Sequence, residues 1–274
     1  MHNDYATECE LMTNAAKQCH DIIMKYFRFG ETVGEDANVQ DKGINNPLTE
    51  ADLAVDRFLH EALLTARPDY GWLSEETVDN LKRLEKRRVW VVDPIDGTKE
   101  FIAGIPQFAI SIGLVEDGHP VAAVVYNPAS EELFSAYLGG GTTLNGQPIQ
   151  TSTHAALKDA SCLASRSETK RGEWDSFKNE LQLTTMGSIA YKLALVAVGR
   201  YDMTFTLTPK NEWDFCAGHL LVTEAGGDIC RKDRSLFQYN QEHPKTRSVV
   251  ATNGPLHEPI LNRLEDVPLG PDRR

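Results

Sequence analysis

Two acids stand at the end of an apolar stretch in WVVDPIDGTKEF, residues 90–101. Asp93 follows Trp-Val-Val, Asp96 comes three residues later, and the stretch has no basic residue before Lys99. A carboxylate beside a buried strand is strongly destabilising when it has no partner. A divalent cation would satisfy both acids, because Mg²⁺ prefers hard oxygen ligands and takes a substrate phosphate as a further ligand. The stretch therefore predicts a metal site, with an aspartate that only caps a turn as the alternative.

The residues next to these acids are typical of a turn that leads into a helix. Pro94 fixes its own φ angle, and Gly97 is free to adopt a positive one. Thr98 suits the start of a helix, where backbone N–H groups point toward an anion. We therefore expect an anion-binding turn beside the metal site.

Further acids lie at the boundaries of predicted elements. Glu75 and Glu76 follow the apolar YGWL stretch, and Asp214 lies in the first turn of a predicted helix. Asp52 lies three residues after Thr49. Each has a structural alternative: a surface position for Glu76, a favourable charge at a helix start for Asp214, and a capping box with Thr49 for Asp52. Together with the first pair, these acids predict one convergent acidic site.

Helices and strands in mixed order must position these acids. Residues 29–47 are polar and rich in Gly and Asn, which predicts a mobile loop. Gly118, between two apolar stretches, indicates a hairpin. Apolar spacing predicts helices over about 4–28, from Thr49 to before Pro68, over 187–200, 213–227 and 256–265, and strands over 70–74, 88–92, 107–115, 119–127, 132–138, 161–165, 201–207 and in GDICR and SVVAT.

The character of the sequence changes near residue 145. Before it, predicted strands follow one another in hairpins, and after it they alternate with helices. We expect an N-terminal α+β lobe over residues 1–145, which contains the strand–turn–helix of the metal site. A C-terminal α/β lobe over residues 146–274 would complete the site.

Composition excludes several classes of protein. The chain has 274 residues with 41% hydrophobic content, enough for a large core. Its net charge of −12 argues against a nucleic-acid polymer as partner. No apolar run approaches the roughly 18 residues of a membrane span, the N-terminus resembles no signal peptide, and five scattered cysteines are typical of reduced thiols. We expect a cytoplasmic protein with Cys216 in its core, and no histidine pattern indicates a site.

These motifs resemble the inositol monophosphatase superfamily, the Mg²⁺-dependent, lithium-sensitive phosphatases. The resemblance runs through TEAD, SEE, WVVDPIDGT, LNG at 144–146 and WDFCAGHLLVTEAGG, and so covers most of the chain. It implies the layered α-β-α-β-α sandwich of the inositol monophosphatase and fructose-1,6-bisphosphatase type. It also implies a phosphomonoesterase that uses metal-activated water, two or three Mg²⁺ per site, and a homodimer.

The family pattern implies roles for matching positions. The implied metal ligands are Glu75, Asp93, Asp96, Asp214 and the carbonyl of Ile95. The implied catalytic residues are Glu75 together with Thr98 and Asp52, which would hold and deprotonate the attacking water. The residues implied to contact the substrate or its phosphate are Gly97, Thr98, Ser188, Lys192 and Asp214. Lys42 lies about where the family carries a lysine near the site, with a solvated loop lysine as the alternative.

The sequence leaves the substrate open. Inositol-specific members carry an acid seven residues before the WD aspartate, and Leu207 occupies that position here. DPIDGTKEF, SRS at 165–167 and the PKN approach at 209–211 are closer to the 3'(2'),5'-bisphosphate nucleotidase branch. Lys192 would meet the second phosphate of such a nucleotide, with exposed helix surface as its alternative. Against this branch, the spacing from Gly-Ser to Lys192 is one residue too long, and no basic residue stands at 206–208.

Three functions therefore remain open. The first is hydrolysis of 3'(2')-phosphoadenosine 5'-phosphate. The second is another specificity of the superfamily: inositol-1-phosphate, a sugar bisphosphate or histidinol phosphate. The third is a non-catalytic regulatory module stabilised by a structural cation. Thr98 and Asp52 argue against the third, because a structural cation needs no pair of residues that activate water.

Overall fold

The computed structural model describes residues 2–41 and 47–271, and its elements form two large sheets with helices on their faces. The helices are α1 (His2–Gln18), α2 (His20–Met24), α3 (Glu50–Ala66), α4 (Thr98–Ile102), α5 (Arg166–Lys170), α6 (Ile189–Ala197), α7 (Glu212–Glu224) and α8 (His257–Leu264), with short 3₁₀ turns η1 (Glu35–Ala37), η2 (Lys82–Glu85) and η3 (Asp175–Phe177). Among the described residues, none of these helices has both the length and the apolar character required to cross a lipid bilayer.

The first sheet has the strand order β3-β4-β5-β6-β7-β8-β9. All its neighbours are antiparallel except β3 and β4, which run parallel. β5 and β6 are joined by Asp117 and Gly118, both at positive φ (50° and 82°), as a two-residue hairpin turn requires. The predicted hairpin is confirmed. The strands of this sheet are β3 (Gly71–Ser74), β4 (Arg88–Asp96), β5 (Ala109–Glu116), β6 (His119–Asn127), β7 (Glu132–Tyr137), β8 (Gly141–Leu144) and β9 (Gln147–Ile149).

The second sheet has the order β11-β10-β12-β16-β14 and mixes parallel and antiparallel neighbours. Two small ribbons, β1–β2 and β13–β15, lie outside both sheets. The remaining strands are β1 (Gln40–Asp41), β2 (Pro47–Leu48), β10 (Ser161–Ser165), β11 (Gln182–Met186), β12 (Met203–Thr206), β13 (Lys210–Asn211), β14 (Asp228–Cys230), β15 (Lys245–Thr246) and β16 (Val249–Thr252).

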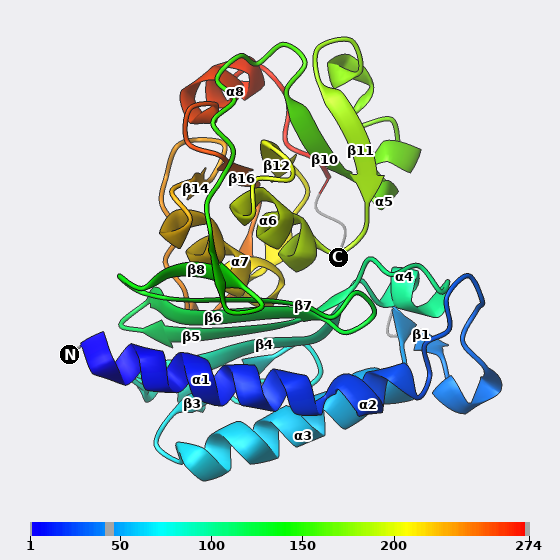
Figure 1. The fold of residues 1–274 in the computed structure, drawn as a ribbon, viewed down its shortest axis with the longest axis vertical. Helices are drawn as coiled ribbons and strands as arrows, with labels where there is room; N and C mark the ends of the chain where they lie inside the picture. The colour runs from blue at the N-terminus through cyan, green and yellow to red at the C-terminus, as the bar shows by residue number, and fades with distance from the viewer. Residues whose placement is uncertain (1, 42–46, 272–274) are drawn as a thin grey trace.

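Helices and sheets alternate in layers (Figure 1). The helices α1, α2 and α3 cover one face of the first sheet, and α6 and α7 lie between the two sheets. The helix α8 covers the far face of the second sheet. The α-β-α-β-α sandwich expected from the sequence is confirmed.

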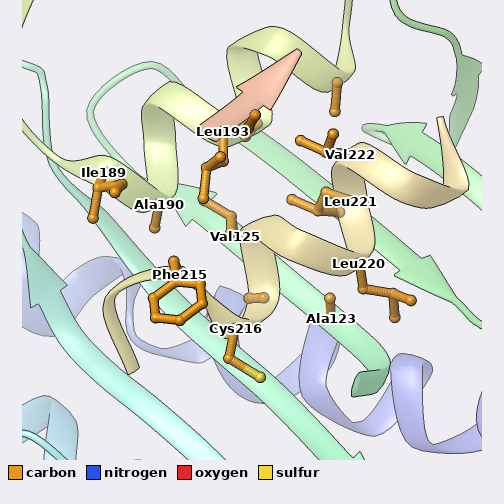
Figure 2. Packing of buried hydrophobic residues seen from close by; sticks show 14 of the residues in the cluster. Ala123, Val125, Ile189, Ala190, Leu193, Phe215, Cys216, Leu220, Leu221 and Val222 are labelled. Carbon is orange, nitrogen blue, oxygen red and sulfur yellow. The ribbon is translucent and has the colours of Figure 1, made fainter. Parts of the chain in front are cut away.

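The largest apolar cluster fills the space between the two sheets, and we call it the inner cluster. Figure 2 shows Leu193 of α6, Leu221 of α7 and Val125 of β6 within this cluster. Val91 of β4 and Ala251 of β16 close the cluster from the two sheets. Alternate residues of β4 face the other way, toward α1 and α3. Both faces of this strand are therefore buried, which explains its continuous apolar sequence.

A β-bulge in β4 decides where its two acids point. Asp93 pairs with Ser111 of β5, whereas Asp96 pairs with Ala109, so three steps along β4 match two steps along β5. Residues three apart on a regular strand face opposite sides of the sheet, and the extra residue removes that difference. Pro94, which has no N–H to donate, lies inside the bulge. Asp93 and Asp96 therefore both lie on the side of the sheet that carries α6 and α7.

Several predicted elements differ in detail from the structure. The helix expected over 4–28 is broken at Cys19, where the backbone N–H reaches only the carbonyl of Ala16, three residues back. The predicted loop at 29–47 contains η1 and the start of the β1–β2 ribbon. The strands β8, β9 and β11 and the short helix α5 were not predicted. The first sheet continues to Ile149, a few residues beyond the change of character near 145.

Candidate active site

The turn after β4 places a helix start beside the two acids. Gly97 has φ of +99°, a left-handed conformation that L side chains rarely adopt. This conformation turns the chain from β4 directly into α4, whose first residue is Thr98. The backbone N–H of Ile95 donates to Asp93 Oδ1 at 3.1 Å, so the local backbone orients this carboxylate.

Asp96 joins the turn to the start of α6. Its Oδ2 accepts hydrogen bonds from Ser188 Oγ at 2.7 Å and from the backbone N–H of Ala190 at 2.6 Å. Ser188 is the N-cap of α6, with φ of +52°, and its hydroxyl also accepts from the N–H of Tyr191 at 3.1 Å. A helix N-terminus favours a negative charge, so α6 helps to keep Asp96 ionised.

The helix α3 brings a third acid to the same turn. Thr49 and Asp52 form the predicted capping box: the N–H of Thr49 donates to Asp52 Oδ2 at 2.8 Å, and the N–H of Asp52 lies 3.4 Å from Thr49 Oγ1. The other oxygen, Oδ1, lies 3.3 Å from Thr98 Oγ1. The same hydroxyl lies 3.0 Å from the carbonyl oxygen of Ile95. Capping alone therefore does not account for Asp52, because it also contacts the turn after β4.

One helical turn further along α3, Asp56 holds the segment that carries Glu75. Asp56 is 7% exposed and accepts hydrogen bonds from Ser74 Oγ at 2.5 Å and from Thr77 Oγ1 at 2.7 Å. The backbone N–H of Glu75 donates to the carbonyl of Val92 in β4. Glu75 is thus fixed between a helix and the strand that carries Asp93.

Asp214 reaches the site from a distant part of the chain, in the first turn of α7. Its Oδ2 accepts the N–H of Asn211 at 2.8 Å. The carbonyl oxygen of the preceding residue, Trp213, accepts a hydrogen bond from Ser111 Oγ at 3.2 Å. Because Ser111 is the β5 partner of Asp93, this bond ties the start of α7 to the sheet at the level of that acid.

The carboxylates lie close enough to affect one another. The pKa of Asp93, which is 2% exposed, is raised well above its usual value, first by burial and then by the charges of Glu75, Asp96, Asp214 and Asp52. Asp96 and Asp214 keep some contact with solvent. Burial raises the pKa of Asp96 to about 6, against hydrogen bonds that lower it. Burial and the charge of Asp96 raise the pKa of Asp214 to about 8.

The donor set fits a hard divalent cation. Asp93, Asp96 and Asp214 each have one oxygen bound by backbone or by α6, and the described residues donate no hydrogen bond to the other oxygen. None of the three forms an ion pair with a described lysine or arginine. No three acidic, His or Cys side chains among these residues converge tightly enough to hold an ion by themselves. Mg²⁺ suits such a set, because it binds one or two carboxylates and completes its shell with water and phosphate.

Basic residues lie on the α6 side of the acids. Lys192 is 3% exposed, which excludes the surface alternative for this residue. Burial lowers its pKa, and the charges of Glu168 and Asp96 oppose that shift. Arg166 Nε donates to Glu100 Oε1 at 3.1 Å and so ties α5 to α4. Leu207, at the position of the inositol-specific acid, instead packs against the apolar cluster that includes Trp174 and Phe205.

The structure therefore brings Glu75, Asp93, Asp96, Asp214, Asp52 and Thr98 to one turn, with Gly97 and Ser188 beside it. Lys42 lies outside the described residues. Sequence reasoning did not identify Asp56 or Ser111, which hold the acids or the elements around them, and it noted Arg166 only as part of the SRS motif. Of Asp56 and Ser111, Asp56 carried a local signal, because it lies four residues after Asp52 and so shares its face of α3.

Known relatives cover almost the whole chain. Residues 4–269 match the model of the inositol monophosphatase family. An inositol-1-monophosphatase from Rhizobium meliloti (strain 1021) is 39% identical over 220 residues, which are 75% of this chain and 82% of that protein. The Nus factor SuhB from Escherichia coli (strain K12) is 31% identical over 265 residues, or 93% of this chain and 95% of that protein.

Solved structures show the same fold. The IMPase of Thermotoga maritima aligns with a TM-score of 0.83 at 25% identity, over 95% of this chain and 98% of that one. The extragenic suppressor protein SuhB from Bartonella henselae aligns with a TM-score of 0.81 at 29% identity, over 94% and 98% of the two chains.

Proposed function

The chain belongs to the inositol monophosphatase family, and from this premise we propose that it hydrolyses 3'(2')-phosphoadenosine 5'-phosphate in a Mg²⁺-dependent reaction. The family is Mg²⁺-dependent and acts on small phosphorylated substrates. The convergence of Glu75, Asp93, Asp96 and Asp214 supports catalysis by this chain, because these acids come from distant segments and a shared cation would offset the repulsion between them. We further propose two or three ions per site.

The chain's own residues would divide the work as follows. Bound Mg²⁺ would neutralise the phosphate charge and make water a better nucleophile near neutral pH. Thr98 Oγ1 and Asp52 Oδ1, which lie 3.3 Å apart, would both hydrogen-bond the attacking water from one side, and Asp52 would take up its proton while the departing ester oxygen takes a proton from solvent. The N–H groups of Gly97 and Thr98 donate to the phosphate oxygens. Most of the rate enhancement then comes from positioning and charge neutralisation.

Two features favour a nucleotide with a second phosphate over inositol phosphate. Lys192 is a buried cation on the α6 side of Asp96, where an additional phosphate would find a partner. Leu207 offers no carboxylate to the hydroxyl groups of a sugar ring and packs in an apolar cluster. The competing candidate is inositol-1-phosphate, because the relative that is 39% identical carries the name inositol-1-monophosphatase.

A substrate panel tests this proposal. We expect kcat/KM in Mg²⁺ to be highest for 3'(2')-phosphoadenosine 5'-phosphate, above inositol-1-phosphate, a sugar bisphosphate and histidinol phosphate, with inhibition by Li⁺. Lys192→Met should lower kcat/KM for the adenosine bisphosphate by about 10- to 100-fold, the value of a charge-assisted contact, and lower it less for adenosine 3'-monophosphate. A higher value for inositol-1-phosphate would overturn the nucleotidase assignment.

The non-catalytic alternative has its own signature. A regulatory module would gain thermal stability from Mg²⁺ and yet release no phosphate from any substrate of the panel.

We also propose that the protein is a cytoplasmic homodimer. Light scattering of the purified protein should give twice the mass of one chain, and a monomer would contradict this.

A further inference from the structure

Arg83 is a buried arginine between the two lobes. It lies in η2 and is 2% exposed. Its Nε and Nη2 donate to Asp79 Oδ2 at 3.1 and 2.8 Å. On the other side, its Nη1 donates to Asn240 Oδ1 at 2.7 Å, and its Nη2 donates to the carbonyl of Gln241 at 2.9 Å. The planar guanidinium thus bridges a segment near β3 and a segment that follows β14.

The first sheet leaves room for this side chain. A Cβ placed on Gly71, the first residue of β3, would lie 3.0 Å from Arg83 Cβ and 3.1 Å from its Cα. This is closer than nine in ten real contacts of a Cβ atom, so a larger residue at Gly71 would push Arg83 away by a few tenths of an ångström. Asn240 makes a second hydrogen bond to Arg83: its Nδ2 donates to the backbone carbonyl of Arg83 at 3.2 Å.

One end of this bridge leads to the start of α7. The backbone N–H groups of Asn240 and Gln241 donate to the carboxylate of Glu212 at 2.7 and 3.1 Å. Glu212 is 3% exposed and is the first residue of α7. Asp214, a proposed metal ligand, lies two residues later in the same helical turn.

The other end leads to Glu75. Asp79 is the last residue of the short segment that begins at Glu75, directly after β3. Asp56 anchors the beginning of that segment through Ser74 and Thr77, and Arg83 anchors its end through Asp79. Arg83 therefore joins the end of the Glu75 segment to the part of the chain that leads to Asp214.

Taking the proposed Mg²⁺ site as given, we propose that Arg83 is a positioning residue that holds the Glu75 segment and the start of α7 at a fixed separation. Ligands contributed by two lobes bind an ion tightly only when their spacing is set before the ion arrives. Arg83 touches neither substrate nor ion, and acts through Asp79 on one side and through Asn240, Gln241 and Glu212 on the other.

Calorimetric titration of the full-length protein with Mg²⁺ alone, without substrate, tests this role. We expect Arg83→Gln to weaken Mg²⁺ binding about 10-fold or more, as loss of a supporting partner does in other metal sites. Arg83→Lys should restore part of the affinity, because lysine keeps a charge but cannot form the fork. Asn240→Gly is the second variant. It removes the two hydrogen bonds between the Asn240 side chain and Arg83, leaves the bonds of Arg83 to Asp79 and to the carbonyl of Gln241, and tolerates the φ of +60° at this position.

The double variant Arg83→Gln/Asn240→Gly should bind Mg²⁺ no more weakly than Arg83→Gln alone, because both changes break the same connection.

The matched control is Arg263→Gln. Arg263 lies in α8, away from the acids, and likewise joins a carboxylate (Glu180 Oε2, 2.7 Å) to a backbone carbonyl (Ser176, 3.1 Å). It should lower the melting temperature and leave Mg²⁺ affinity unchanged.

The proposal is overturned if Arg83→Gln and Asn240→Gly lower the melting temperature but keep Mg²⁺ affinity within about twofold of wild type. Loss of a residue that supports the metal ligands should lower the affinity by more than this. If Arg83→Gln does not fold, Asn240→Gly decides by the same criterion. If the wild-type protein binds Mg²⁺ but hydrolyses no phosphate ester, the proposed function fails, and the titrations still decide the role of Arg83. If the wild-type protein binds no Mg²⁺, both proposals fail.

Discussion

Asp93 is the most buried of the acids proposed as metal ligands, and four other carboxylates raise its pKa after burial itself. In the absence of a cation, Asp93→Asn should therefore stabilise the fold, because a neutral amide avoids the cost of burying a carboxylate, or of protonating it, among four other acids. The same change should abolish the gain in melting temperature caused by Mg²⁺ and lower phosphatase kcat/KM by at least about 100-fold. Thermal unfolding in EDTA and in Mg²⁺, with phosphate-release assays, measures both effects.

The matched control for this prediction is Asp21→Asn, on an exposed part of α2. It should leave the Mg²⁺-dependent gain in melting temperature and kcat/KM unchanged. An Asp93→Asn protein that keeps its Mg²⁺-dependent activity would remove Asp93 from the set of ligands.

The raised pKa values also predict how the stability of the metal-free protein depends on pH. Burial and Asp96 raise the pKa of Asp214 to about 8, and burial raises that of Glu212 to about 7. The folded state then holds more protons than the unfolded state, whose carboxyls titrate near pH 4, so the free energy of unfolding falls as pH rises. Burial lowers the pKa of His219 to about 4, which has the opposite effect only below its unfolded value of about 6.5.

Between about pH 6.5 and pH 8, the melting temperature in EDTA should therefore decrease as pH rises. In Mg²⁺ it should not, because the cation binds the deprotonated carboxylates and its affinity increases with pH. Melting curves across this range, with and without EDTA, decide the matter. A rise of the EDTA melting temperature with pH would contradict the prediction.

At the scale of residues, the sequence indicated which acids come together at the candidate site and not what holds them there. Acids after an apolar strand are visible as residue types at fixed spacing. Their supports are not, because Arg83 and Asn240 are 157 positions apart and meet only in the folded chain. Asp52 shows the limit of a local signal: the capping box with Thr49 was predicted and is present, while its contact with Thr98 depends on tertiary structure.

At the scale of elements, apolar periodicity predicted the long helices and the buried strands, because burial dictates their patterns. It did not separate α1 from α2, since Ala15, Cys19 and Ile23 keep one buried face across the break. The strands β8 and β9 were missed because they are short and contain a single buried residue, Thr142, so they show no apolar pattern. The β-bulge at Pro94 could not be read from β4 alone, since a register exists only between two strands.

The turn between β4 and α4 gives a prediction at this scale. A Cβ on Gly97 would lie 2.8 Å from the carbonyl oxygen of Gln107 and 3.2 Å from Ser188 Cβ. Gly97→Ala should therefore combine the strain of a positive φ, about 1–2 kcal/mol, with a steric clash of about 1–3 kcal/mol. It should also displace Ser188, which donates to Asp96. We expect loss of stability together with a higher Mg²⁺ requirement for activity, measured by denaturant unfolding and Mg²⁺-dependent kinetics.

Gly146→Ala is the matched control for the turn. Gly146 has φ of +79°, but a Cβ there meets no atom within 4 Å. This variant should lose only the strain, about 1–2 kcal/mol, and should keep the Mg²⁺ requirement of the wild type. Equal losses in the two variants would mean that the contacts around Gly97 contribute nothing.

At the scale of the whole molecule, the division into residues 1–145 and 146–274 is a proposal about architecture rather than about independent folding. The inner cluster contains Val91, Val125 and Phe134 from the first part and Leu193 and Leu221 from the second. Neither part could bury these side chains without the other. The acids follow the same plan, since Asp93 and Asp214 come from different parts.

The shared inner cluster predicts that both parts unfold together. Scanning calorimetry in EDTA should show one transition, with equal calorimetric and van't Hoff enthalpies. Its enthalpy should be roughly 190 kcal/mol, from about 0.7 kcal/mol per residue over 274 residues. Mg²⁺ should move this single transition as a whole to higher temperature, because its proposed ligands come from both parts and binding favours the folded state. Two transitions in EDTA, with Mg²⁺ shifting only one of them, would show that the lobes are separate folding units and that the ions act within one lobe.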